Sequence, residues 1–180
     1  MDYPTIEQLK SFFFRAMLNS GWVGGGKIAE STKREGYKIV RFLDEEEGLL
    51  LIDTWCSGGG GHSSGSTTIY MDRQEGHDGR HGRVWVPVWT MSYMGRYDDE
   101  AIPTVKNALR VAYQSNHFFG GRGPVTFNQD GWHYRNSIAS HSTDDMFTFF
   151  EGQEDVADRN ETLRGFHSFT GMLLFDRNDA

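Results

Sequence analysis

Apolar residues recur every three to four positions in two segments, which predicts two amphipathic helices. The first is expected over Thr5–Asn19, with these side chains on one face: Ile6, Leu9, Phe13 and Met17. Thr5 and Gln8 have the spacing of a capping box, which marks a helix start. The second helix is expected from Pro103 to near Asn116, with an apolar face of Val105, Ala108, Leu109, Ala112 and Tyr113.

Between and after these helices, apolar and polar residues alternate with the period of a β-strand. Each half of the chain has three such segments, at Gly48–Trp55, Ser64–Tyr70 and Val84–Gly95, and at Trp132–Ile138, Phe150–Val156 and Phe166–Gly171. Short polar loops between consecutive strands favour antiparallel pairing. Pro87 has no N–H to donate to a neighbouring strand, so it predicts a bulge or an edge.

The same order of elements occurs twice, which indicates an internal repeat. Pro4-Thr5-Ile6 corresponds to Pro103-Thr104-Val105, and each helix is followed by an aromatic and glycine-rich turn. We therefore predict an α+β fold of two tandem pseudo-symmetric repeats, each a helix plus three or four antiparallel strands. Residues 1–97 form the first repeat, with a polar insert at about 74–83, and residues 98–180 form the second. Together they are expected to make one compact structural domain.

Five motifs spread over almost the whole chain carry a family resemblance. They are Trp22-Val23-Gly24-Gly25-Gly26, Asp53-Thr54-Trp55, Gly65 to Ile69, Val88 to Gly95, and Arg122-Gly123-Pro124. The chain thereby resembles a bacterial and archaeal family catalogued as domain of unknown function 5680. It departs from that family at Ser64 and Thr67, where an aromatic residue and a glutamate are usual. Some members follow a helix-turn-helix in transcriptional regulators, so the resemblance implies a module for ligand sensing or assembly and no defined activity.

Composition narrows the classes of partner. The 180 residues include 18 Lys and Arg against 25 Asp and Glu, giving a net charge of −7 without any basic run. Nucleic-acid binding by this chain alone is therefore disfavoured. No apolar stretch has the length of a membrane span, the start MDYPTIEQLK does not look like a signal peptide, and Cys56 is the single cysteine. These features predict a cytoplasmic protein without a membrane partner, and they leave a small-molecule ligand or a homo-oligomer open.

Asp53 stands out because it is a carboxylate within the apolar run from Leu49 to Trp55. A buried carboxylate must be paired or hydrogen-bonded, and Arg122, Arg135 or a cationic ligand could serve. Aromatic residues at corresponding places of the two halves suggest a cleft between the repeats. The predicted ligand-binding residues are Asp53, Trp55, Trp89, Tyr93, Trp132 and Tyr134.

Other motifs lead to weaker hypotheses. Gly24 to Lys27 lacks the hydroxyl residue and the strand–helix context of a phosphate loop, and it is better explained as a helix-terminating turn. His77 and His81 lie among turn residues, so a solvated loop is favoured over a metal site. The sequence accordingly predicts neither a metal nor a cofactor.

Three functions remain open from the sequence. The first is a non-catalytic module that binds a small molecule, or a partner, at an aromatic-lined cleft between the repeats. The second is a small hydrolase- or isomerase-type enzyme in which Asp53 or Glu154 works with a nearby histidine as acid and base. The third is a purely assembling protein. A carboxylate and an imidazole within hydrogen-bond reach inside a cleft would favour the enzyme.

Overall fold

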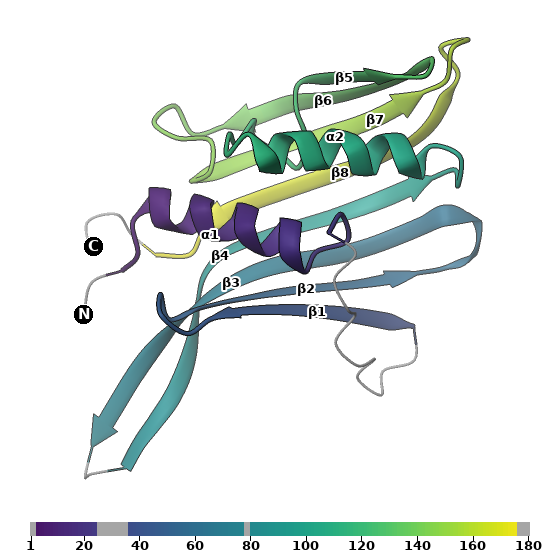
Figure 1. The fold of residues 1–180 in the computed structure, drawn as a ribbon. Coiled ribbons are helices and arrows are strands. Elements are labelled where there is room, and N and C mark those ends of the chain that lie inside the picture. Colours follow the sequence, from purple (N-terminus) through teal and green to yellow (C-terminus); the bar gives the residue numbers. More distant parts are fainter. Residues whose placement is uncertain (1–2, 25–35, 78–79, 176–180) are drawn as a thin grey trace.

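A computed structural model describes residues 3–24, 36–77 and 80–175, with side chains described outside residues 74–82. The chain forms two α-helices, a short 3₁₀ turn and eight strands (Figure 1). In chain order these are α1 (Ile6–Asn19), β1 (Tyr37–Asp44), β2 (Leu49–Ser57), η1 (Gly59–Gly61), β3 (His62–His77), β4 (Arg80–Tyr97), α2 (Ile102–Gln114), β5 (Thr126–Gln129), β6 (Trp132–His141), β7 (Phe149–Ala157) and β8 (Leu163–Leu173). None of the helices in the described ranges is long and apolar enough to cross a lipid bilayer.

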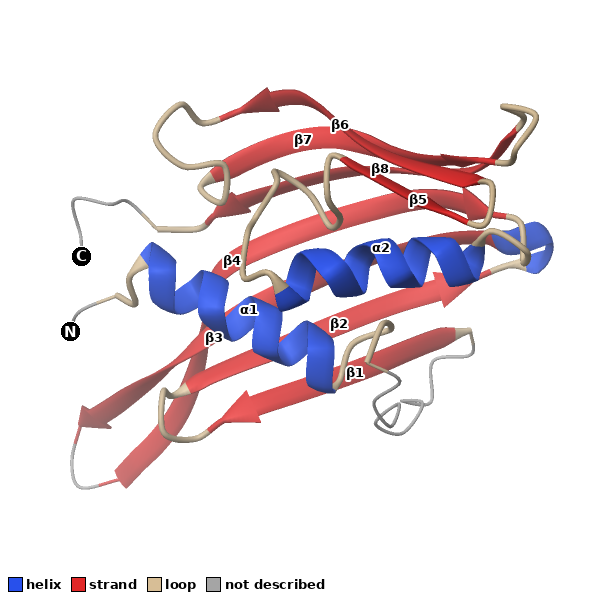
Figure 2. Ribbon diagram, turned by 45° about the horizontal axis from the view of Figure 1, so that its top comes forward, coloured by secondary structure: helices blue, strands red, loops and turns tan. Residues whose placement is uncertain are grey.

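All eight strands belong to one antiparallel sheet in the order β1-β2-β3-β4-β8-β7-β6-β5. Both helices lie against the same face of this sheet (Figure 2). The α+β class and the antiparallel pairing are thus as predicted, and the sheet is the larger part of the fold. β4 and β8 pair at its centre, with Tyr93 opposite Phe169 and Trp89 opposite Leu173.

All six strands expected from the sequence are present, but β1 and β5 were not anticipated. β1 is an edge strand in which charged residues interrupt the apolar ones, and four of its eight residues are exposed, among them Lys38 and Arg41. β5 has only four residues and forms the opposite edge. Edge strands bury little side-chain area, so their sequences carry a weak apolar pattern.

The predicted start of the first helix is confirmed. The Thr5 hydroxyl accepts a hydrogen bond from the Gln8 backbone N–H at 3.2 Å, and the Gln8 side chain accepts one from the Thr5 N–H at 2.8 Å. This reciprocal pair satisfies donors that a helix start leaves free. α1 then buries Leu9, Phe13 and Met17 as expected.

The helices and the sheet enclose an aromatic core. Tyr113 on α2 contacts the ring of Phe13 on α1 edge-on, with ring centroids 5.8 Å apart. Trp89 at the sheet centre is completely buried, stacks on Phe147 at 4.6 Å, and donates its indole N–H to the Phe147 carbonyl at 3.0 Å. Trp89 therefore has both its apolar area and its single donor satisfied within the core.

The hairpin of β3 and β4 carries the predicted polar insert. Its ladder continues through Gln74 opposite Arg83 to His77 opposite Arg80, so the backbone of this segment is an extension of two strands. The side chains of His77 and His81 lie outside the described part of the structure. The pairing register shifts between Ile69 and Tyr70, where Tyr70 lies opposite Pro87, as the lack of a proline N–H predicts.

Candidate functional site

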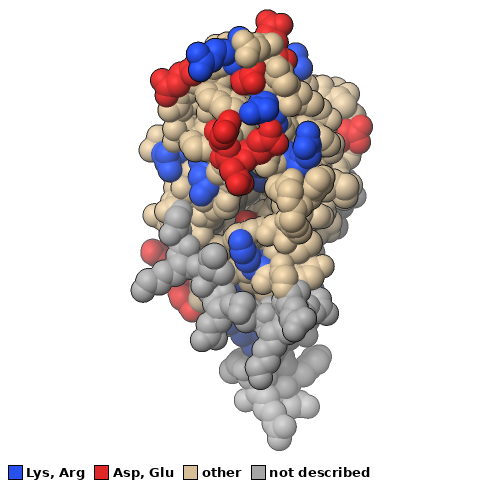
Figure 3. Space-filling model, turned by 90° about the vertical axis from the view of Figure 1, so that its right-hand side faces the viewer, with Lys and Arg blue, Asp and Glu red and all other residues tan. Residues whose placement is uncertain are grey.

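A cavity of about 360 Å³ opens between the two helices and the end of the sheet where β2 and β4 finish and β3 begins. This end of the molecule faces the viewer in Figure 3, where acidic and basic side chains lie next to each other and neither sign dominates. Residues on both sides of the β4–β8 junction line the cavity. A volume of this size accommodates a small organic molecule.

The outer wall of the cavity carries aromatic and apolar side chains among exposed polar ones. It includes Trp22 in the turn after α1, Trp55 on β2, and Ile102 at the start of α2. Lys106 lies 4.7 Å from the ring centre of Trp22, so that indole already has one cationic neighbour. Trp55 is half-buried and presents apolar surface to whatever enters.

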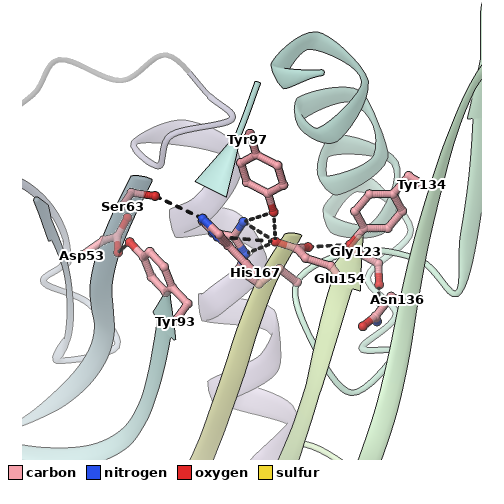
Figure 4. Close-up of polar contacts among 10 residues, drawn as sticks. Asp53, Ser63, Tyr93, Tyr97, Gly123, Tyr134, Asn136, Glu154 and His167 are labelled. Carbon is pink, nitrogen blue, oxygen red and sulfur yellow. Dashed lines mark hydrogen bonds and ion pairs between the residues drawn. The ribbon is translucent and has the colours of Figure 1, made fainter. Parts of the chain in front are cut away.

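Asp53 projects from β2 into the polar inner part of the cavity and is only 2 % exposed. Its Oδ1 accepts a hydrogen bond from Tyr93 Oη (Figure 4) and another from Thr67 Oγ1, both at 2.9 Å. Its Oδ2 accepts none from the described residues, and it is therefore the oxygen left to meet a ligand. Burial raises the pKa of this carboxyl, although the two hydroxyl donors and the charge of Arg122 act in the opposite direction.

Glu154 on β7 is the second buried carboxylate, and its surroundings satisfy it completely. Arg122 donates from Nε and Nη2 to Oε1, Tyr97 donates to Oε1 at 2.6 Å, and Tyr134 donates to Oε2 at 2.6 Å. Burial alone would raise the pKa of Glu154, but Arg122 and the other partners hold it below its ordinary value. Glu154 is thus a charged group with a charged partner.

His167 on β8 lies between Ser63 and Glu154. Its Nε2 lies 3.1 Å from Ser63 Oγ, and its Nδ1 lies 3.8 Å from Glu154 Oε1 (Figure 4). Burial and the nearby Arg122 lower the pKa of His167 to about 3, so the imidazole is neutral near pH 7. The order hydroxyl, imidazole, carboxylate is that of a nucleophile relay, but the second distance is too long for a hydrogen bond.

Two polar atoms in the cavity wall have no hydrogen-bond partner in the described part of the chain. They are Tyr113 Oη and His167 Nδ1, and both are buried. A buried polar atom without a partner costs free energy, about 1–3 kcal/mol. Because these atoms border a cavity, a ligand or water molecules placed there can satisfy them.

The structure brings together half of the predicted binding residues. Asp53, Trp55 and Tyr93 line the main cavity. Trp89 is sealed in the core, and Tyr134 is buried as a donor to Glu154. Trp132 lies in a separate surface pocket, beside Asp158 and Arg164.

Other functional candidates were not anticipated as site residues. Arg122, considered as a partner for Asp53, bonds Glu154 instead, and Arg135 pairs with Asp155. Ser63, His167 and Tyr113 also line the cavity, and they come from β3, β8 and α2. Arg122 had a signal in the Arg-Gly-Pro motif, whereas Ser63 and Tyr113 had none that distinguished them from ordinary surface and core residues.

No protein-family model, curated protein or solved structure matches this chain. The resemblance to the family of unknown function 5680 stays a prediction from the motifs. The cavity chemistry is therefore the basis on which a function can be proposed. Within the described residues, no group of three or more histidine, cysteine, aspartate or glutamate side chains is arranged to hold a metal ion.

Proposed function

We propose that this protein binds a small organic molecule in the main cavity and does so without chemical conversion. The observation that carries the proposal is the buried Asp53 carboxylate, whose Oδ2 lacks a donor in the described chain while its side chain lines a cavity of about 360 Å³. Small-molecule sites combine mostly apolar walls with a few placed polar groups. Trp22, Trp55 and Ile102 supply such a wall, and Asp53 supplies a polar anchor.

We further propose that the chain is a pair of pseudo-symmetric repeats and that the ligand lies where they meet. One helix followed by four strands occurs twice in the chain, and the sheet order runs inward from β1 to β4 and outward from β8 to β5. Asp53 opposes Thr67 on the second and third strands, as Asn136 opposes Glu154 on the sixth and seventh. These correspondences support the repeat, and the mixed lining of the cavity supports a shared site.

An enzyme that uses Ser63 as a nucleophile is the second candidate, favoured by the 3.1 Å contact between Ser63 and His167. Two features count against it. A histidine with a pKa of about 3 is a weak base near neutral pH, and Glu154 already accepts bonds from Arg122 and two tyrosines. Reaction with a fluorophosphonate probe tests this candidate directly, since an activated serine is labelled and Ser63→Ala abolishes the labelling.

The binding proposal is tested with a pair of variants on one strand. Ser63 lines the cavity, whereas the adjacent and exposed Ser64 does not belong to its lining. Ser63→Phe should fill the cavity, and Ser64→Phe adds the same ring without entering it. Native mass spectrometry of the freshly purified protein, followed by a thermal-shift screen, identifies ligands for wild type.

We expect ligands to be retained by Ser64→Phe and lost by Ser63→Phe. Circular dichroism of both variants confirms that each is folded. A ligand that binds the two variants equally well does not occupy the cavity, and that result would contradict the proposal.

A further inference from the structure

We propose that the main cavity selects a ligand with a compact cationic nitrogen group, such as an amidinium, guanidinium or protonated amine, which bonds Asp53 Oδ2. This inference rests on the proposed binding function and specifies the chemical class of the ligand. The apolar body of the ligand would lie toward Trp55 and Ile102 at the outer wall.

Glu154 shows how this fold accommodates a buried carboxylate. Its oxygens accept hydrogen bonds from Tyr97 and Tyr134, and the guanidinium of Arg122 completes the set. That guanidinium also lies 4.9 Å from the ring centre of Tyr93, within the range of a cation–π contact. A carboxylate, tyrosine hydroxyls and an aromatic face together make a cation site, and here the chain itself provides the cation.

Asp53 has the same kind of surroundings without a bonded cation, since Arg122 acts on it through its charge and makes no hydrogen bond to it. Two hydroxyl donors occupy Oδ1, and Tyr93 and Tyr113 are aromatic neighbours in the cavity wall. Tyr93 is shared between the two sites, since its hydroxyl bonds Asp53 while its ring faces Arg122. The Asp53 site is therefore a carboxylate site in which Oδ2 is open to a cation from outside the described chain.

The other positive charges near the cavity do not fill this role. Arg122 is committed to Glu154 by two of its nitrogens and makes no hydrogen bond to Asp53. Lys38 lies on β1 at the cavity wall, is exposed, and makes no ion pair within the described residues. A buried carboxylate without a counter-charge is costly, so a cationic ligand gains both the ion pair and the relief of that cost.

Three ligands with the same ring and different charge test the inference on wild-type protein. Benzamidine is cationic, benzamide is its neutral isostere and benzoate is anionic. Isothermal titration calorimetry at pH 8 should give at least tenfold tighter binding for benzamidine than for benzamide, and no binding for benzoate. Benzamide binding as tightly as benzamidine, or no binding of benzamidine, would overturn the inference.

Two variants with the same charge change locate the effect. Asp53→Asn keeps an acceptor for Tyr93 and Thr67 but removes the charge, so benzamidine should lose its advantage over benzamide. Glu46 is exposed and does not line the cavity, so Glu46→Gln should leave the ratio within about twofold of wild type. An unchanged ratio in Asp53→Asn would overturn the assignment to Asp53.

A third readout needs no variant. Because a cation binds the ionised form of Asp53, benzamidine affinity should fall once the pH is low enough to protonate that carboxyl, whereas that of benzamide should change little. A benzamidine affinity that falls no more than that of benzamide in a series from pH 8 to 4 would contradict the inference. Failure of this inference is distinguishable from failure of the binding proposal. If ligands bind equally well whatever their charge but are still lost in Ser63→Phe, only the inference about charge fails.

Discussion

Asp53 and Glu154 are the only buried carboxylates among the described residues, and only Glu154 bonds an arginine. Each lies opposite a neutral polar residue on the neighbouring strand, Asp53 opposite Thr67 and Glu154 opposite Asn136. Asp53 lies on β2, which is nearer the sheet edge than its partner strand β3. Glu154 lies on β7, which is nearer the sheet centre than its partner strand β6. Thus both halves place one carboxylate under the helices, but they differ in whether the chain supplies its counter-charge.

Removal of the internal counter-charge should be strongly destabilising. In Arg122→Met, Glu154 remains buried without its cation, and we expect a loss of about 3–5 kcal/mol in the free energy of unfolding. Arg135 also pairs with an aspartate, but its side chain is 65 % exposed. Arg135→Met should cost less than about 1 kcal/mol. Urea denaturation compares the two, and a similar loss in both would show that burial of the Arg122 pair is unimportant.

Asp53→Asn should change the dependence of stability on pH. The pKa of Asp53 is raised in the folded state, so the carboxyl holds its proton more tightly there than in the unfolded chain. Wild type therefore gains stability from this group at acidic pH and loses it as the pH rises through the raised pKa.

Relative to wild type, Asp53→Asn should become more stable as the pH increases from about 4 to 8, and at pH 8 it should melt at the same or a higher temperature. Thermal melts in a buffer series measure this difference. A variant that loses stability against wild type as the pH rises would indicate that Asp53 has a counter-charge within the protein.

His167 should affect stability in the opposite direction to Asp53, because its contribution is lost as the pH falls. Its pKa is about 3 in the folded state against an ordinary value of 6.5, so below pH 6.5 the unfolded chain takes up a proton that the folded protein does not. Stability from this group is lost as the pH falls from 6.5 towards 3, at roughly 1.4 kcal/mol per pH unit.

His167→Gln can still bond Ser63 and should flatten this decline, whereas His133→Gln, at an exposed position on β6, should retain the wild-type profile. Urea denaturation between pH 4 and 8 is the appropriate measurement. Parallel profiles for His167→Gln and wild type would contradict the neutral state assigned to this imidazole.

Trp89 was predicted from the sequence as a binding residue. Because it is buried in the core, its substitution should reduce stability and leave ligand binding unchanged. Trp89→Phe loses the hydrogen bond to the Phe147 carbonyl and part of a packed indole. We expect a loss of about 2–3 kcal/mol in stability. Benzamidine affinity should stay within twofold of wild type, because Trp89 does not line the main cavity. A large change in affinity without a change in stability would reverse this interpretation.

Sequence patterns predicted most of the fold because burial leaves a periodic signal. The capping box at Thr5 and the alternation around Val84 to Gly95 depend on neighbours close in sequence, and both correspond to elements in the structure. β1 and β5 lie at the sheet edges, where exposure weakens the pattern. Among the described residues, both helices lie on the same face of the sheet.

Two residues of the candidate site could be predicted because local sequence sets them apart. Asp53 was recognisable because a charged residue interrupts an apolar strand, and Tyr93 because it belongs to a large aromatic set. The partner of Arg122 was not predictable, since Asp53 and Glu154 are both carboxylates on strands. Only the strand order decides that Arg122 reaches Glu154, and that order is a long-range property of the fold.

The central pairing of β4 with β8 also bears on the order in which the molecule assembles. The hairpins within each half join neighbouring strands, whereas Ser63 and His167 are 104 residues apart and meet only once β3, β4 and β8 have assembled side by side. Contacts of high sequence separation carry a larger loop-closure cost and form more slowly. We therefore expect the cavity to be the last region to acquire protection from hydrogen exchange during refolding, after the outer hairpins are formed. A folding intermediate of this kind would contain most of the secondary structure and none of the binding site.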